Sequence, residues 1–195
     1  WIRRHLAEQA RRRRALAARP PLAAGRVIPF VGRPHTVWLE RAGDGRTSVR
    51  HDAAGARLVI AITARERRSP EAILEAWLRD RARAAIGAAV ERHAPGLGVR
   101  PVAVTVRDAR TRWGSCSRAG RLSLSWRLIL APPEALETVV VHELCHLRLF
   151  GHGPRFRALL AGQVPDHARW RRWLHDHSSE LHAALQPSEG DRAAA

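Results

Sequence analysis

The sequence predicts an α+β protein in which a small β-rich region precedes a core of mixed helices and strands. Three observations lead to this prediction. Residues 26–62 are rich in β-branched and aromatic residues, with glycine and aspartate turns between them. A long segment from Ser69 then places its apolar residues at helical spacing. After residue 100, two strand-like segments are followed by three helical ones, within a length of 195 residues that suits one domain with appendages.

The first sixty residues divide into a helix and four strands. Residues 1–19 have sparse apolar positions and a run of arginines, and two prolines follow them, so we expect a solvated helix. The strands are predicted over VIPFVG, HTVWLE, TSVRH and RLVIAI. The segment Asp52–Gly55, between the last two strands, is typical of a hairpin turn.

A helix is predicted to begin after Ser69. Serine is a favoured N-cap residue, and Pro70 suits the first helical position. The apolar residues that share one face of this helix are Ile73, Leu74, Trp77 and Leu78. Pro95 and Gly96 are expected to end it.

Two further strands are predicted, over residues 101–108 and 121–130. In the second, leucines alternate with serines, which indicates a half-buried strand. A strand of this kind can border a substrate cleft and accept an extended peptide through main-chain hydrogen bonds. The alternative is an ordinary internal strand of the sheet. The segment between them, TRWGSCS (111–117), is interpreted as a tight turn at Gly114 with Trp113 packed beneath the core.

The last part of the chain is predicted to be helical. Pro132 and Pro133 open a helix that is expected to end at a C-terminal cap on Gly151. A short helix from Pro154 to about Leu160 and a final helix over residues 167–185 follow, and the last ten residues are expected to fray.

The helix after Pro133 carries the sequence His-Glu-Leu-Cys-His at residues 142–146. His142 and His146 lie one turn apart on one face, so both imidazoles can reach a single metal ion. Glu143 lies ~100° further round the helix, where its carboxylate can take a proton from a water that the metal activates. This arrangement predicts a metal centre with Glu143 as general base.

A catalytic zinc usually has three protein ligands and one open position. His152 is the preferred third ligand, because it follows His146 by six residues and comes just after Gly151, where the chain can fold back. The alternatives are Asp166, His167 and Glu180. The six-residue spacing occurs in metzincins, but the chain contains no methionine for a Met-turn, so a metzincin is not expected.

The chain resembles a known family through two segments. These are RTRWGSCSRAGRLSLSWRLILAPPEALETVVVHELCHLRLFGHGPRF (110–156) and VPDHARWRRWL (164–174). They are similar to the YgjP-like metallopeptidases, relatives of the SprT-like and WLM zinc proteases, and a looser similarity extends back to the first residues. At positions 138, 157 and 167 the chain has threonine, arginine and histidine, which differ from the residues usual in this family. These differences leave the metal ligands unchanged, so the substrate preference of the family does not carry over to this chain.

The resemblance implies a zincin-like α+β fold with a mixed or antiparallel sheet. It also implies a zinc ion held by His142, His146 and His152, with Glu143 as the catalytic base. Some members of the family are linked to nucleotide pyrophosphatase activity. A β segment normally precedes the position of Trp1, so we expect the natural start of the chain to lie upstream.

Three regions are expected along the chain. Residues 1–62 form an N-terminal helix and β-rich segment, residues 63–175 a zincin-like catalytic core, and residues 176–195 the end of the last helix and a flexible tail.

The RWGSC segment also has a catalytic interpretation, in which it lies beside the metal. Arg112 would then stabilise the oxyanion that forms on the attacked carbonyl, since the chain has no tyrosine for that role. His167 is the alternative. Cys116 and Cys145 are interpreted as buried packing residues rather than reactive thiols.

The charge indicates which partners are possible, and the cysteine content indicates the cellular compartment. The net charge is +16 and all 34 basic residues are arginine, which fits a nucleic-acid or nucleotide partner as well as it fits a solvated basic surface. Two cysteines without a CxxC pair indicate a reducing, cytoplasmic setting. No apolar run approaches the ~20 residues of a membrane span.

We therefore expect a zinc-dependent hydrolase, in first place a metallopeptidase that cleaves peptide or protein substrates. One alternative is a nucleotide triphosphate pyrophosphohydrolase, which the arginines favour, although no glycine-rich phosphate loop and no acidic magnesium cluster is visible in the sequence. The other is a DNA-associated SprT-like protease or binding module, for which the charge is the argument.

Overall fold

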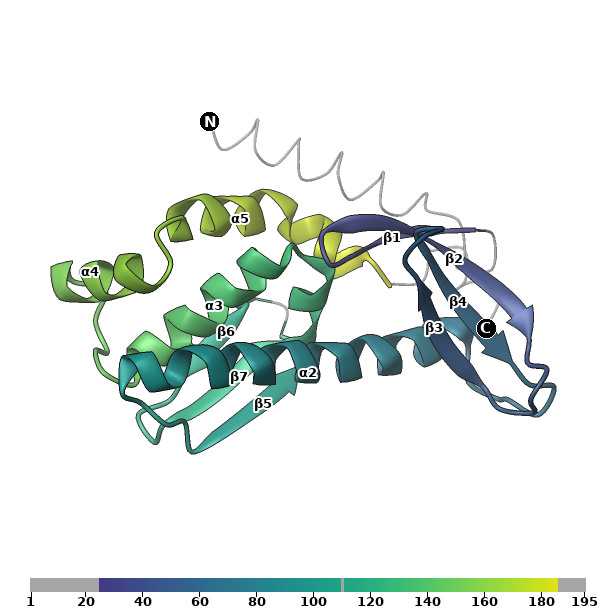
Figure 1. The fold of residues 1–195 in the computed structure, drawn as a ribbon, viewed down its shortest axis with the longest axis horizontal. Helices are drawn as coiled ribbons and strands as arrows, with labels where there is room; N and C mark the ends of the chain where they lie inside the picture. The colour runs from purple at the N-terminus through teal and green to yellow at the C-terminus, as the bar shows by residue number, and fades with distance from the viewer. Residues whose placement is uncertain (1–24, 110, 186–195) are drawn as a thin grey trace. The chain divides into compact units, whose positions relative to one another are not determined.

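The computed structural model describes residues 25–109 and 111–185 (Figure 1). Within these ranges it contains two small sheets and four α-helices, so the predicted α+β class is confirmed. The helix expected over residues 1–19 and the tail expected at the end of the chain lie outside the described residues.

The described chain forms two compact units. The first comprises residues 25–29, 34–77 and 178–185, and the second comprises residues 30–33 and 78–177. The domain boundaries expected after residues 62 and 175 remain predictions.

The first sheet contains the four strands that the sequence predicts. They are β1 (Val27–Phe30), β2 (Arg33–Arg41), β3 (Ser48–Asp52) and β4 (Arg57–Ile62), in the order β1-β2-β4-β3. β4 pairs parallel with β2 and antiparallel with β3. The expected hairpin turn is present, and the Gly55 amide donates to Asp52 Oδ1 at 3.0 Å.

Helix α2 (Pro70–Leu97) begins as predicted and ends slightly later. The Ala72 amide donates to Ser69 Oγ at 3.2 Å, which is the expected N-cap bond. The helix continues past Pro95 to Leu97, and its end is closed by hydrogen bonds from the amides of residues 98 and 99 to the carbonyls of Pro95 and Ala94. Gly98, with a φ of 63°, adopts the left-handed conformation that closes this end.

Residues 30–33 are fixed to the second unit by close backbone contacts. The Val31 and Gly32 amides donate to the carbonyls of Ile129 and Leu130 at 2.9 and 3.1 Å. Gly32 has a φ of 74°, and a Cβ there would lie 2.8 Å from Pro132 Cα. Glycine is therefore required at this position for its conformation and for the space.

The second sheet has three strands rather than the two that the sequence predicts. They are β5 (Ala103–Arg107), β6 (Gly114–Cys116) and β7 (Arg121–Ser125), in the order β5-β7-β6. The segment interpreted as a tight turn at Gly114 thus contains a strand, which pairs antiparallel with β7. Trp113, expected beneath the core, is only half-buried.

The strand predicted over residues 121–130 is wrong in its second half, and its first half is the internal strand that the sequence left as an alternative to a strand at the cleft edge. Residues Trp126–Leu130 form a buried 3₁₀ turn, η2, because Ser125 Oγ accepts a hydrogen bond from the Arg127 amide and starts the turn. β7 is also the central strand, paired with β5 on one side and with β6 on the other. It therefore cannot accept a peptide, whereas β5 and β6 are the edge strands of this sheet.

Helix α3 (Pro133–His146) packs against β6, β7 and η2, and helix α4 (Pro154–Gln163) packs against α3 (Figure 1). α3 ends at His146 rather than at the expected cap on Gly151. Its last turn tightens, because the amides of Leu147 and Arg148 bond to carbonyls three residues earlier. Helix α5 (His167–Ala183) follows, as predicted.

Within the described residues, no helix combines the length and the apolar character that crossing a bilayer requires.

Candidate metal centre

Three histidine side chains meet at the end of α3. His142 and His146 project from its last turn, and His152 comes from the loop that follows. The Nε2 atoms of His146 and His152 each lie 3.2 Å from Nε2 of His142. All three lie within 4.8 Å of one another, and no other histidine, cysteine or acidic residue of the described chain joins this group.

The spacing of these nitrogens suits a metal ion. Two nitrogens held 2.0–2.1 Å from a tetrahedral zinc lie about 3.3 Å apart, close to the 3.2 Å observed for the two pairs that include His142. The rival third ligands Asp166, His167 and Glu180 lie outside the group. The structure thus brings together the three residues that the sequence puts forward, while their role as ligands remains a prediction.

The backbone after α3 fixes the tautomer of one of these rings. His146 Nδ1 lies 3.1 Å from the Leu149 carbonyl oxygen. A carbonyl only accepts hydrogen bonds, so Nδ1 carries the proton and Nε2 keeps its lone pair for a metal. The tight turn that ends α3 early is what places this carbonyl beside the ring.

Phe156, on the first turn of α4, packs against all three imidazoles. Its ring centroid lies 5.0, 4.6 and 4.9 Å from those of His142, His146 and His152. The side chain is only 2% exposed. The rings are therefore held by an apolar wall on one side, which limits the rotamers they can adopt.

Burial and neighbouring charge favour the neutral form of His142 and His146. Burial lowers the pKa of His142 to about 4, with further lowering by the other two histidines and by Arg171. Burial also lowers the pKa of His146, against the raising effect of the Leu149 carbonyl. Neutral imidazole is the form that binds a metal, so these environments favour ligation near neutral pH.

Glu143 lies in a buried position against strand β6. The residue is 6% exposed, and burial raises the pKa of Glu143 to about 7, which the charge of Arg112 opposes. A Cβ on Gly114 would lie 2.7 Å from Glu143 Oε1 and 2.8 Å from its Cγ. The carboxylate therefore occupies the space that the missing side chain of Gly114 leaves.

Other predicted site residues surround this carboxylate. Arg112 is exposed and its charge acts on Glu143. Cys116 is half-buried rather than buried, and desolvation and then the charge of Glu143 raise the pKa of its thiol. A raised pKa agrees with the interpretation of Cys116 as an unreactive thiol. Cys145 is fully buried in α3, as expected.

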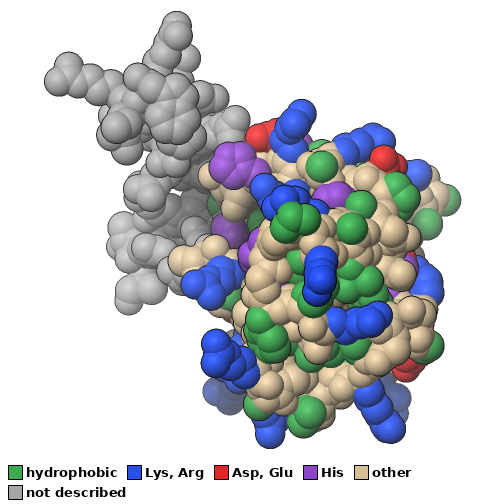
Figure 2. All heavy atoms as spheres, turned by 90° about the vertical axis from the view of Figure 1, so that its left-hand side faces the viewer, with side chains coloured by type: hydrophobic (Ala, Val, Ile, Leu, Met, Phe, Trp, Pro, Cys, Tyr) green, Lys and Arg blue, Asp and Glu red, His purple; other side chains and the backbone are tan. Residues whose placement is uncertain are grey.

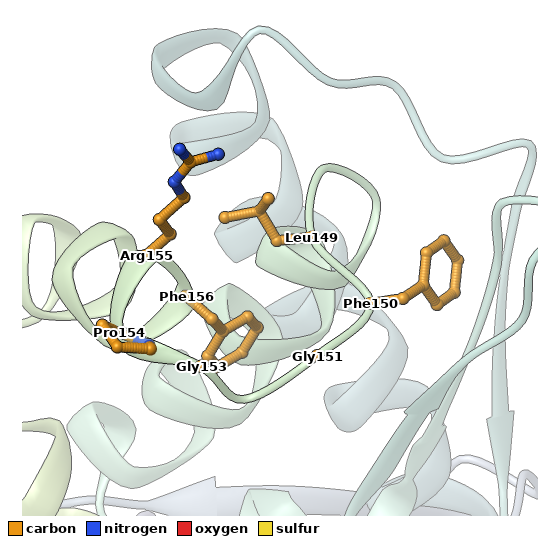
Figure 3. Close-up of a pocket in the computed structure, with 7 residues that line it drawn as sticks. All are labelled: Leu149, Phe150, Gly151, Gly153, Pro154, Arg155 and Phe156. Atoms are coloured by element: carbon orange, nitrogen blue, oxygen red, sulfur yellow. The ribbon is translucent and has the colours of Figure 1, made fainter.

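A hollow of about 440 Å³ lies beside the loop that carries His152. Residues 149–151 and 153–156 line it, and most of this lining is apolar. Figure 3 shows Phe156 turned in beside the backbone of Gly151 and Gly153, with Phe150 and Arg155 pointing away from each other. Phe150 is 52% exposed, so an apolar side chain is presented to solvent close to the metal centre.

The sequence did not single out Phe156, the Leu149 carbonyl or the contact between Gly114 and Glu143. Each is a contact between segments whose packing depends on where α3 ends and on the presence of β6. The sequence offered only an indirect indication that these residues belong to the site. Gly114 and Phe156 both lie inside the segment that carries the family resemblance.

The chain matches a protein-family model over most of its length. The model described as YgjP-like, metallopeptidase domain, matches residues 1–177. Neither a curated protein nor a solved structure matches the chain significantly.

Proposed function

Because the chain belongs to the YgjP-like metallopeptidase family, which indicates a metal-dependent hydrolase, we propose that it is a zinc-dependent peptidase. The observation that carries the proposal is the juxtaposition of three imidazoles with a buried carboxylate at the end of α3. Three nitrogen ligands suit zinc better than magnesium, which prefers oxygen ligands.

In this proposal His142, His146 and His152 hold the ion. When bound, zinc supplies Lewis-acid activation of a water and polarisation of the substrate carbonyl. Glu143 accepts the proton of the attacking water and delivers it to the leaving nitrogen as the peptide bond breaks. A pKa near 7 for Glu143 suits both roles, because its carboxyl can then gain and lose a proton at neutral pH.

Substrate would pair with the open edge of β6. An extended chain adds to an edge strand through main-chain hydrogen bonds, and Gly114 of β6 is in contact with Glu143. A peptide on this edge would pass beside the general base. Arg112 is the candidate for stabilising the oxyanion, since its charge already acts on Glu143, and His167 is the alternative.

The proposal is tested with zinc-loaded protein and quenched-fluorescence peptides. The expected result is about one zinc per chain and peptide cleavage that Glu143→Gln reduces by about 10²–10⁴-fold without loss of zinc. Cleavage that survives Glu143→Gln would contradict the assignment of the base.

The two alternatives predict other outcomes. Release of pyrophosphate from nucleoside triphosphates without peptide cleavage would favour the pyrophosphohydrolase. Salt-dependent DNA binding by a protein that hydrolyses neither substrate would favour a binding module.

A further inference from the structure

The surroundings of the metal centre carry an excess of positive charge. Residues 147–177 include six arginines, two aspartates and no glutamate. Figure 2 shows the face on which α4 lies, with arginine side chains over much of it and acidic ones mainly near its edges. The net charge of +16 is thus partly concentrated on the segments that carry or follow the ligands.

Four arginine side chains, three from this segment and Arg112 from before β6, are linked to the centre by separate observations. Arg157 Nη1 donates to the His152 carbonyl at 2.8 Å. Arg155 lines the hollow beside the ligand loop (Figure 3). The remaining two are Arg171, whose charge acts on His142, and Arg112, whose charge acts on Glu143. They come from α4, from α5 and from the segment before β6, so they approach the centre from different elements.

These four arginines have no ion-pair partner among the described residues, and all four are exposed. Several other arginines of the chain are paired, for example Arg50 with Glu40 at 3.4 Å. Exposed like charges around a cleft focus the field into it and attract ligands of opposite sign. The charge at the metal centre is therefore available to a bound molecule.

We propose that this rim of arginines selects peptides with glutamate or aspartate beside the scissile bond. The inference rests on the proposed peptidase function and names its substrate class. A guanidinium pairs with a carboxylate through two parallel hydrogen bonds. The four arginines lie around the imidazoles and Glu143, which are the groups that would act on the scissile bond. Their guanidinium groups would therefore contact the substrate side chains on either side of that bond. A nucleic-acid partner is disfavoured because the lining of the adjacent hollow is mainly apolar.

The test compares three peptides that differ only in the residues flanking one scissile bond, which are glutamate, glutamine or lysine. Zinc-loaded protein is expected to cleave them with kcat/KM falling in that order, by roughly two- to fivefold for each exposed ion pair. The difference should lie in KM, and it should shrink when salt rises from about 0.05 M to about 0.5 M, since the Debye length becomes shorter.

Two variants locate the effect. Arg155→Gln and Arg171→Gln are expected to reduce the glutamate-to-lysine ratio of kcat/KM, with zinc content measured for each. The matched control is Arg41→Gln, because Arg41 is exposed on β2 in the other compact unit. It removes the same charge from the molecule and should leave the ratio unchanged.

Three results would overturn the proposal. Equal cleavage of all three peptides would refute the charge preference and leave the peptidase function standing. An equal effect of Arg41→Gln would show that net charge, not this rim, is responsible. Stronger competition by a DNA oligonucleotide than by a glutamate peptide would assign the rim to nucleic acid. Absence of cleavage of every peptide would instead refute the proposed function itself.

Discussion

Replacement of Gly114 by alanine should disable the general base without disturbing the metal ligands. The new Cβ would lie 2.7, 2.8 and 3.0 Å from Oε1, Cγ and Cδ of Glu143. Ordinary contacts of a Cβ lie beyond 3.4 Å, so the carboxylate must shift by roughly 0.5–1 Å. The backbone of Gly114 is in a strand and not in the left-handed region, so alanine adds no backbone strain there.

The size of the effect follows from the displacement. A shift of about 1 Å in a catalytic group costs about 10²-fold in rate, which corresponds to about 2.7 kcal/mol in the activation free energy. Crowding in this buried place should also lower the free energy of unfolding by about 1–3 kcal/mol. We expect kcat on a peptide substrate to fall by about 10²-fold while zinc content stays at about one per chain.

The assay combines peptide cleavage, elemental analysis and urea unfolding on the same preparations. Gly87→Ala is the matched control, because Gly87 lies inside α2 and a Cβ there meets nothing within 4 Å. It should leave activity unchanged and raise the free energy of unfolding by about 0.5–1 kcal/mol. A folded Gly114→Ala protein with wild-type kcat would refute the reasoning, because Glu143 would then not need the position that it occupies.

Three further predictions concern the ligands and the scaffold. His152→Ala should lower zinc content well below one per chain in elemental analysis, and a variant that keeps its zinc would remove His152 from the ligand set. Phe156→Leu should weaken zinc binding by about tenfold in chelator competition, because the wall behind the imidazoles is altered; unchanged affinity would show that the wall does not position them. His93 and Arg92 hold the pKa of Glu137 below its ordinary 4.5, so the stability that this group contributes is present above that value and is lost as the pH falls through the lowered pKa. Glu137→Gln should therefore reduce the loss of urea resistance between pH 7 and about pH 3, and an identical loss in the variant would contradict this.

The sequence predicted the local elements well where the determinants are local. Ser69 and Pro70 start α2, and Pro132 and Pro133 start α3, because capping and the fixed φ of proline act within a few residues. The helical spacing of His142 and His146 likewise sufficed to place both rings on one face.

The errors arose where pairing or tertiary contacts decide the conformation. β6 has only three residues and includes a glycine, so it carries no strand pattern of its own and exists through its pairing with β7. Alternation of leucine and serine in β7 predicted one buried face correctly, since Leu122 and Leu124 are buried. It could not show that both edges of that strand are occupied.

The short strand β6 links the fold to the proposed chemistry. Its pairing with β7 sets Gly114 opposite Leu124, and Leu124 is 1% exposed, so the register is fixed by a core residue. The same glycine contacts Glu143 on α3, and β6 has no strand partner on its other edge within the described residues. A peptide that paired with this edge would take its register from the strand that already positions the general base. The distance between the bound carbonyl and Glu143 would then be set by the sheet rather than by flexible side chains, which is why a single methyl group at position 114 is the sharpest test of the site.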